Sequence, residues 1–105
     1  MNHGLSDSTE KSIRKVLTHH PEVEKAVLYG SRAKGTHHPG SDIDITLCGK
    51  HLDHALLTRI ENELDDLMLP HRIDLSLFEK LTHPGLLDHI RRVGVTFYER
   101  AAVTQ

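Results

Sequence analysis

Residues 28–45 read LYGSRAKGTHHPGSDIDI and contain the strongest signals in this chain of 105 residues. Their first part completes an apolar run over 26–29 that stops at Gly30, which is typical of a buried strand. The middle is rich in Gly, Ser, Thr, His and Pro and indicates a loop. The last part alternates, with Asp42 and Asp44 on one face of a second strand and isoleucines on the other. The stretch predicts strand, loop, strand, with two carboxylates where the second strand begins.

On either side of this stretch, hydrophobic periodicity predicts three longer helices and two more strands. The expected elements are a helix from an Asp7 cap to about His19, a strand over 24–29, a possible helical turn over 31–34, a strand over 42–48 with Thr46 on its polar face, a helix over 52–69, a strand over 71–78, a helix from Pro84 to a terminal Gly94, and a strand over 95–98. This order predicts an α/β domain (α+β-like) in which helices pack on a small mixed sheet. Residues 1–6 are expected to be a loose start.

Length and composition exclude several classes of function. A chain of 105 residues predicts one domain, 1–105, with no separate substrate domain. The net charge of 13 − 15 = −2 and the aromatic content of 4% disfavour direct nucleic-acid binding. No apolar run is long enough for a membrane span and no signal peptide is visible. A single cysteine, Cys48, cannot form an internal disulfide, so the expected location is the cytoplasm.

Gly30 and Ser31 directly follow the first strand and suggest an anion site. A glycine lets the backbone approach a ligand closely, and free amides at the start of a helical turn, with a serine hydroxyl, bind phosphate. Arg32 and Lys34 add positive charge. An ordinary turn is the alternative, and the Gly-Ser pair alone would favour it.

Three aspartates are the candidate metal ligands. Asp42 and Asp44 lie two residues apart on one strand face, with Cα atoms roughly 6.5–7 Å apart, and their repulsion needs a reason. A divalent cation with oxygen ligands supplies one. Asp74 would join them if the strand over 71–78 is a neighbour, which describes a two-metal phosphoryl- or nucleotidyl-transfer site. The alternative is a solvent-facing strand edge.

The spacing Gly30-Ser31, ten residues, Asp42-x-Asp44 resembles the signature of the DNA polymerase β nucleotidyltransferase superfamily. Residues 72–75, RIDL, look like the third carboxylate strand of that family, and residues 90–98 look like the closing segment of its smallest members. Over about 8–99 the chain is similar to a minimal nucleotidyltransferase, the MNT-domain antitoxin type that is usually paired with a HEPN-domain toxin. The resemblance implies a polymerase-β-like nucleotidyltransferase fold.

The resemblance also implies roles for individual residues. Asp42, Asp44 and Asp74 would hold two Mg²⁺ ions, with Asp74 helping to remove the proton from the attacking hydroxyl. The nucleotide-binding set would comprise Gly30, Ser31, Arg32, Lys34 and Ser41. The implied reaction transfers AMP from ATP to a tyrosine hydroxyl of the cognate HEPN toxin and releases pyrophosphate.

Two other functions stay open on the sequence. One is a binding module that neutralises a toxin by docking alone, and the other is a small-molecule nucleotidyltransferase. Ten histidines are also unusual for this length. His37 or His38 could touch a nucleotide, and a transition-metal site is conceivable. Most of the others, His89 among them, are expected to be solvated because their spacing is not that of metal ligands.

Overall fold

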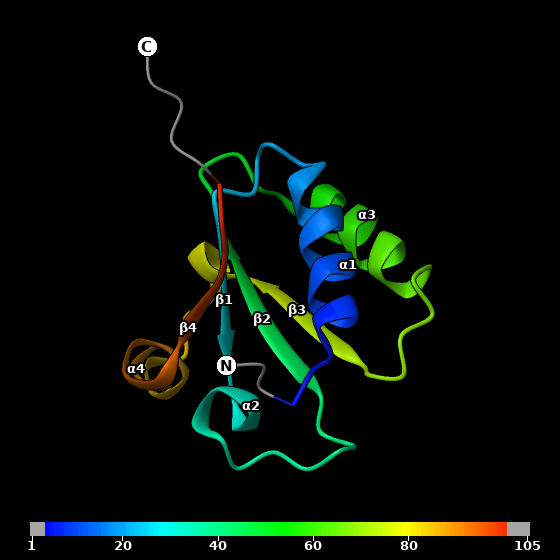
Figure 1. Cartoon of the computed structure of the whole chain (residues 1–105). Helices are drawn as coiled ribbons and strands as arrows, with labels where there is room; N and C mark the ends of the chain where they lie inside the picture. Colours follow the sequence, from blue (N-terminus) through cyan, green and yellow to red (C-terminus); the bar gives the residue numbers. More distant parts are fainter. Residues whose placement is uncertain (1–3, 101–105) are drawn as a thin grey trace.

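A four-stranded sheet in the order β3-β2-β1-β4 organises residues 4–100, the part of the chain that the computed structural model describes. Figure 1 shows the arrangement. The elements in chain order are α1 (Asp7–Thr18), β1 (Lys25–Tyr29), α2 (Ser31–Lys34), β2 (Ile43–Cys48), α3 (His54–Asp65), β3 (Ile73–Leu77), the 3-10 turn η1 (Phe78–Lys80), α4 (Pro84–Val93) and β4 (Val95–Glu99).

The sheet is mixed, as predicted. β1 runs antiparallel to both β2 and β4, whereas β2 and β3 are parallel. Parallel neighbours need a crossover connection, and α3 supplies it between β2 and β3. The last described strand, β4, returns to pair with the first strand, β1. The expected small mixed sheet with helices packed on it is confirmed.

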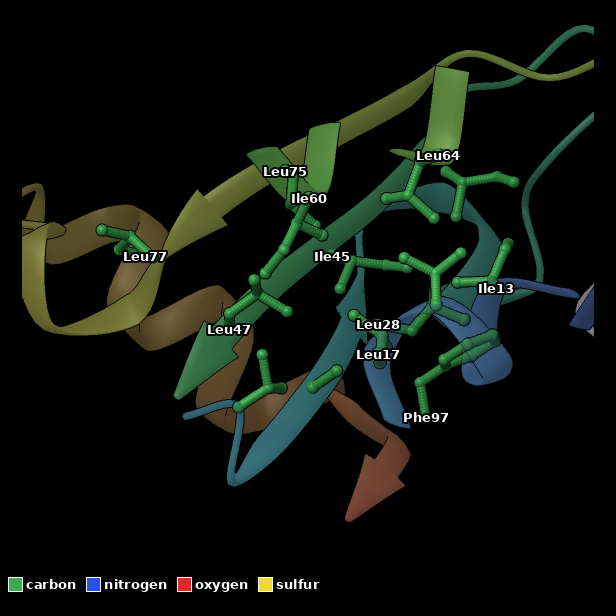
Figure 2. Close-up of a cluster of buried hydrophobic side chains, with 14 of the residues drawn as sticks. Ile13, Leu17, Leu28, Ile45, Leu47, Ile60, Leu64, Leu75, Leu77 and Phe97 are labelled. Atoms are coloured by element: carbon green, nitrogen blue, oxygen red, sulfur yellow. The ribbon is translucent and has the colours of Figure 1, made fainter. Parts of the chain in front are cut away.

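Helices lie on both sides of the sheet, with α1 and α3 on one face and α4 on the other (Figure 1). The core lies between the sheet and the helices α1 and α3, and Figure 2 shows it in close-up. Its buried side chains come from every layer of that half of the molecule; they include Ile13 and Leu17 of α1, Leu28, Ile45, Leu47, Leu75 and Phe97 of the strands, and Ile60 and Leu64 of α3. These are the inward positions that the sequence alternation predicted.

The face of β2 that points away from this core is accessible only at one end. Thr46 was expected on a polar face, and the structure corrects its exposure. Thr46 lies on the same face as Asp44 but is fully buried. The reason is that α4 packs over β1 and the turn η1 packs over β2, so that this part of the face is covered. Polar side chains stay accessible only toward the start of β2.

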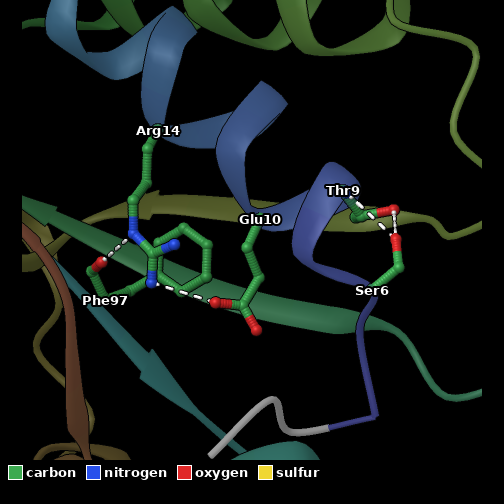
Figure 3. A network of polar contacts seen from close by, with 5 residues as sticks. All are labelled: Ser6, Thr9, Glu10, Arg14 and Phe97. Carbon is green, nitrogen blue, oxygen red and sulfur yellow. Dashed lines mark hydrogen bonds and ion pairs between the residues drawn. The ribbon is translucent and has the colours of Figure 1, made fainter.

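The cap of α1 is Ser6 rather than the predicted Asp7. Ser6 has extended backbone angles, and its Oγ accepts the Thr9 N–H at 3.1 Å, so Asp7 becomes the first helical residue. Glu10, in the first turn of α1, forms an ion pair with Arg14 at 3.1 Å. Figure 3 shows these contacts.

Arg14 attaches α1 to the last strand (Figure 3). Its Nε donates to the carbonyl oxygen of Phe97 at 2.9 Å, and its guanidinium carbon lies 4.5 Å from the centre of the Phe97 ring. One residue thereby makes a charge-assisted hydrogen bond and a cation–π contact. The contact joins segments that are 83 residues apart.

Helix α3 is shorter than predicted. It begins after Asp53, whose carboxylate accepts the Leu56 N–H at 2.9 Å, and it ends at Asp65 rather than near Leu69. The N–H of Met68 bonds to the Asp65 carbonyl three residues back, which tightens the chain into a turn. Met68 itself has φ +56° and is exposed. The apolar spacing continues past the helix because Leu67 and Leu69 pack against the core from this turn.

Two smaller expectations also change. The start of the chain is not loose where it is described, because Leu5 is 1% exposed and belongs to the core; residues 1–3 lie outside the described part. Gly94 ends α4 with φ −60°, not with a left-handed backbone. Glycine fits there because a Cβ would lie 2.3 Å from the Ile90 carbonyl oxygen. Within residues 4–100, no helix has the length and apolar character needed to cross a membrane.

Candidate active site on one face of the sheet

The predicted carboxylates meet on one face of the sheet. Asp44 of β2 and Asp74 of β3 are register partners in the parallel ladder, so they lie side by side on adjacent strands. Asp42 is exposed just before β2 begins, and Asp74 is also exposed, whereas Asp44 is half-buried. The strand pairing thus brings together residues that are 30 positions apart in the sequence.

The pKa of Asp44 is raised above its ordinary value. Burial is the largest cause, and the negative charges of Asp74 and then Asp42 add to it, while His89 opposes the shift. A raised carboxylate pKa means that the ionised form is disfavoured in the folded protein. A bound cation would relieve both the burial and the repulsion.

The donor chemistry fits a hard divalent cation such as Mg²⁺, which prefers carboxylate oxygens. In the part of the chain that the structure describes, no three histidine, cysteine, aspartate or glutamate side chains are already gathered as a metal site. The three aspartates share a face while their carboxylates stay apart. Like charges arranged in this way are expected to move together only around a cation.

Gly30 is pressed against Asp44, and this contact defines the other wall of the site. Gly30 has φ +77° and ψ −157°, a conformation essentially restricted to glycine. A Cβ at this position would lie 2.2 Å from Oδ2 of Asp44. The missing side chain therefore allows the loop backbone to touch the carboxylate.

The predicted helical turn after Gly30 is confirmed as α2. Ser31 is its first residue and is half-buried, while Lys34 is exposed at its end. Gly30 and Ser31 come directly from the end of β1, whose last residue pairs with Asp44. The Gly-Ser pair and the aspartates thus lie at the same end of the sheet.

Arg32 is buried and makes contacts within the protein. Its Nε and Nη2 donate to the carbonyl oxygen of Ser41 at 3.2 and 2.9 Å, and Nη2 lies 3.3 Å from Nδ1 of His71. Burial and the neighbouring Arg32 charge lower the pKa of His71. The Ser41 hydroxyl accepts the His38 N–H at 2.9 Å. Arg32 and Ser41 therefore hold the two ends of the loop over 35–41 together.

His89 of α4 was expected to be solvated, but it lies at the site. Its Nε2 accepts the Gly30 N–H at 3.0 Å, and its ring meets the Tyr29 ring edge to face, with centroids 6.2 Å apart. Sequence spacing carries no signal for this contact, because it depends on how α4 folds back over β1. Two other histidines also have structural contacts: His20 bonds to Glu63 at 2.9 Å, and His83 caps α4.

Comparison with known proteins agrees with the fold. Residues 11–102 match the family described as polymerase beta, nucleotidyltransferase. No curated protein matches the chain. A chain of the crystal structure of a toxin–antitoxin with AMP-PNP is 25% identical, with a TM-score of 0.71, and the match covers 87% of this chain and 73% of that one.

Two further solved structures are similar. A chain of a mutant MntA–HpeT toxin–antitoxin is 26% identical, with a TM-score of 0.69, over 87% of this chain and 72% of that one. The structure of a tri-AMPylated Shewanella oneidensis HEPN toxin in complex with an MNT antitoxin matches at 20% identity and a TM-score of 0.66, over 89% and 71% of the two chains. The expected resemblance to MNT antitoxins is confirmed.

Proposed function

Because this chain belongs to the polymerase beta nucleotidyltransferase family, we propose that it transfers AMP from ATP to a tyrosine hydroxyl of a HEPN-type partner toxin and acts as the antitoxin of that pair. The observation that carries the proposal is the side-by-side placement of Asp44 and Asp74 with Gly30 against Asp44. Among similar structures, one toxin–antitoxin contains AMP-PNP and another contains an AMPylated HEPN toxin. ATP and Mg²⁺ are available in the cytoplasm, where we place the reaction.

Asp42, Asp44 and Asp74 would hold two Mg²⁺ ions. When bound, such ions neutralise the triphosphate and lower the pKa of the attacking hydroxyl. The three aspartates lie in different environments. Asp44 is half-buried and Asp42 and Asp74 are exposed, so the exposed carboxylates can exchange protons with solvent while Asp44 stays fixed against the loop.

Gly30 and Ser31 would bind the phosphates through backbone amides and the Ser31 hydroxyl. Lys34 is exposed at the end of the same turn and would attract the leaving pyrophosphate. In this proposal Arg32 and Ser41 act indirectly, because the Arg32 guanidinium holds the Ser41 carbonyl and shapes the loop. The phosphate contacts then come from the turn, and the loop over 35–41 sets its position.

The reaction is a single displacement at the α-phosphorus of ATP. The tyrosine oxygen forms a bond to that phosphorus, the bond from the phosphorus to the oxygen that bridges to the β-phosphate breaks, and pyrophosphate leaves. The tyrosine proton passes to a carboxylate, and Asp74 is the exposed candidate. The products are the adenylylated toxin, pyrophosphate and a proton.

Mass spectrometry of the cognate toxin after incubation with this protein, ATP and Mg²⁺ tests the proposal. We expect the toxin to gain the mass of one or more AMP units, and Asp42→Asn, Asp44→Asn and Asp74→Asn each to lower the rate by at least about a hundredfold, as expected for groups acting on the transition state. Asp66→Asn, an exposed acid at the end of α3, is the matched control and should react normally.

The same variants separate catalysis from docking. If Asp42→Asn/Asp44→Asn fails to modify the toxin and also fails to neutralise it, neutralisation requires the transfer reaction. Full neutralisation by this variant, with no adenylate on the toxin, would replace the proposal with the binding-module function.

A further inference from the structure

His89 is the residue of α4 that reaches the end of β1. It lies 59 positions from Gly30 in the sequence, yet its Nε2 accepts the Gly30 N–H at 3.0 Å. The same imidazole meets the Tyr29 ring at an interplanar angle of 79°. One side chain thus contacts both the last residue of β1 and Gly30. Gly30 is the first residue of the segment over 30–41, which we call the phosphate loop.

The backbone at Gly30 needs such a support. Glycine has access to many conformations, so the φ of +77° and ψ of −157° must be fixed by surrounding contacts. On one side, Asp44 lies where a Cβ would be. No side chain caps the start of α2, and the Gly30 N–H is bound by His89 instead. Without His89 the Gly30 N–H would lose the side chain that binds it.

We propose that His89 is a positioning residue of the nucleotide site, which fixes the Gly30 backbone so that the Ser31 amide and hydroxyl face the triphosphate. This inference rests on the proposed function, because it concerns the same phosphate loop. His89 acts through Gly30 and takes no part in bond making. Helix α4 therefore belongs to the nucleotide site together with the loop and the strands.

The phosphate loop is then held from two sides. Arg32 ties the far end of the loop to the Ser41 carbonyl, and His89 ties the near end to α4. The two supports differ in strength, because the Arg32 contacts are charge-assisted and the His89 contact is a single neutral hydrogen bond. The near end is accordingly the more sensitive to a single substitution.

Binding of ATP in the presence of Mg²⁺, measured by titration calorimetry on the full chain, tests this role. A hydrogen bond of ordinary strength predicts that His89→Ala binds ATP roughly threefold to tenfold more weakly. His89→Phe keeps an aromatic ring beside Tyr29 but offers no acceptor, so it should bind as weakly as His89→Ala. His89→Gln places an amide oxygen near the position of Nε2 and should recover most of the affinity.

Three results would overturn the role of His89. One is unchanged ATP affinity in His89→Ala, whatever its melting temperature, because that describes a merely structural contact. The second is failure of His89→Gln to recover affinity beyond His89→Phe. The third, which requires no variant, is the absence of NMR scalar coupling between the Gly30 amide nitrogen and Nε2 of His89 in the wild type.

The control is His54→Ala, an exposed histidine at the start of α3, which should bind ATP normally. Failure of the proposed function gives a different pattern. If the wild type itself does not bind ATP, the nucleotide site is absent and both proposals fall. If the wild type binds ATP and His89→Ala binds it equally well, only the role of His89 is lost.

Discussion

The site depends on Gly30 having no side chain. The backbone can lie against Asp44 because no Cβ stands between them, and the left-handed φ is accessible at little cost to glycine alone. The neighbouring Gly35 also has a left-handed backbone, with φ +81°, but nothing lies within 4 Å of its Cβ position. A substitution at Gly35 therefore meets only αL backbone strain, whereas one at Gly30 meets a more restricted backbone conformation and a steric clash.

Gly30→Ala should lose ATP binding, whereas Gly35→Ala should keep it. An alanine at position 35 would be in the αL region at a cost of roughly 1–2 kcal/mol. At position 30 the backbone conformation is essentially restricted to glycine, and the Asp44 carboxylate must also move. We expect thermal unfolding to show a larger loss of stability for Gly30→Ala, and calorimetric titration to show loss of ATP affinity in that variant alone. Equal ATP affinity in the two variants would contradict the close contact between Gly30 and Asp44.

At the scale of the helices and strands, periodicity predicted which elements exist but not where they end. The alternation around Asp42 and Asp44 identified β2 and its carboxylate face, because side-chain direction in a strand is fixed by position alone. The start of α1 and both ends of α3 were wrong because capping depends on one local hydrogen bond, such as that from the Thr9 N–H to Ser6 Oγ.

Tertiary contacts were the other part that the sequence could not predict. The burial of Thr46 depends on α4 and η1 covering one end of a strand face, and the approach of His89 to Gly30 depends on the path of α4. Neither contact can be predicted from the spacing of residues along the chain. The Gly-Ser and Asp-x-Asp motifs were visible because their members lie within one short stretch.

Ser6→Ala should lower the free energy of unfolding by about 1 kcal/mol, the usual cost of removing an N-cap. The Ser6 hydroxyl also donates to Thr9 Oγ1 at 3.0 Å, so the substitution frees two polar groups at the start of α1. Ser8→Ala, an exposed change in the first turn of α1, is the matched control, and it should be neutral or slightly stabilising because alanine favours helix. Urea denaturation of both variants measures the difference, and equal stability would return the cap to Asp7.

At the scale of the whole molecule, the ionised Asp44 carboxylate lowers the stability of the folded state. Asp44 has a raised pKa, so its ionised form is less favourable in the folded state than in the unfolded one. The contribution of this group to stability is accordingly greatest at low pH and is lost as the pH rises through the folded pKa. At neutral pH the free protein carries that cost, and bound Mg²⁺ with ATP should remove it.

Mg²⁺ with ATP at a hundred times the dissociation constant should stabilise the fold by about 2.7 kcal/mol. For a domain of this size each kcal/mol raises the melting temperature by about 4–8 °C, so the shift is easily measured by differential scanning fluorimetry. Chelation of the metal should abolish it. Asp42→Asn/Asp44→Asn should show no shift with ATP, yet melt no lower than the free wild type, because the repulsion is gone. A wild-type shift in that variant would rule out the aspartates as the metal ligands.

The pairing of β1 with β4 determines when the proposed nucleotide site can first be completed during synthesis. All three aspartates have been synthesised once residue 74 is made. The β1–β4 pairing is completed only after residue 99 is made, because Glu99 is the partner of Lys25. α4 and its imidazole are held in place by the strand that follows them. Closing such a long stretch of chain is slow compared with forming a helix. A nascent chain would therefore carry all three aspartates and still lack the β1–β4 pairing, so the proposed nucleotide site could not be complete before residue 99 had emerged.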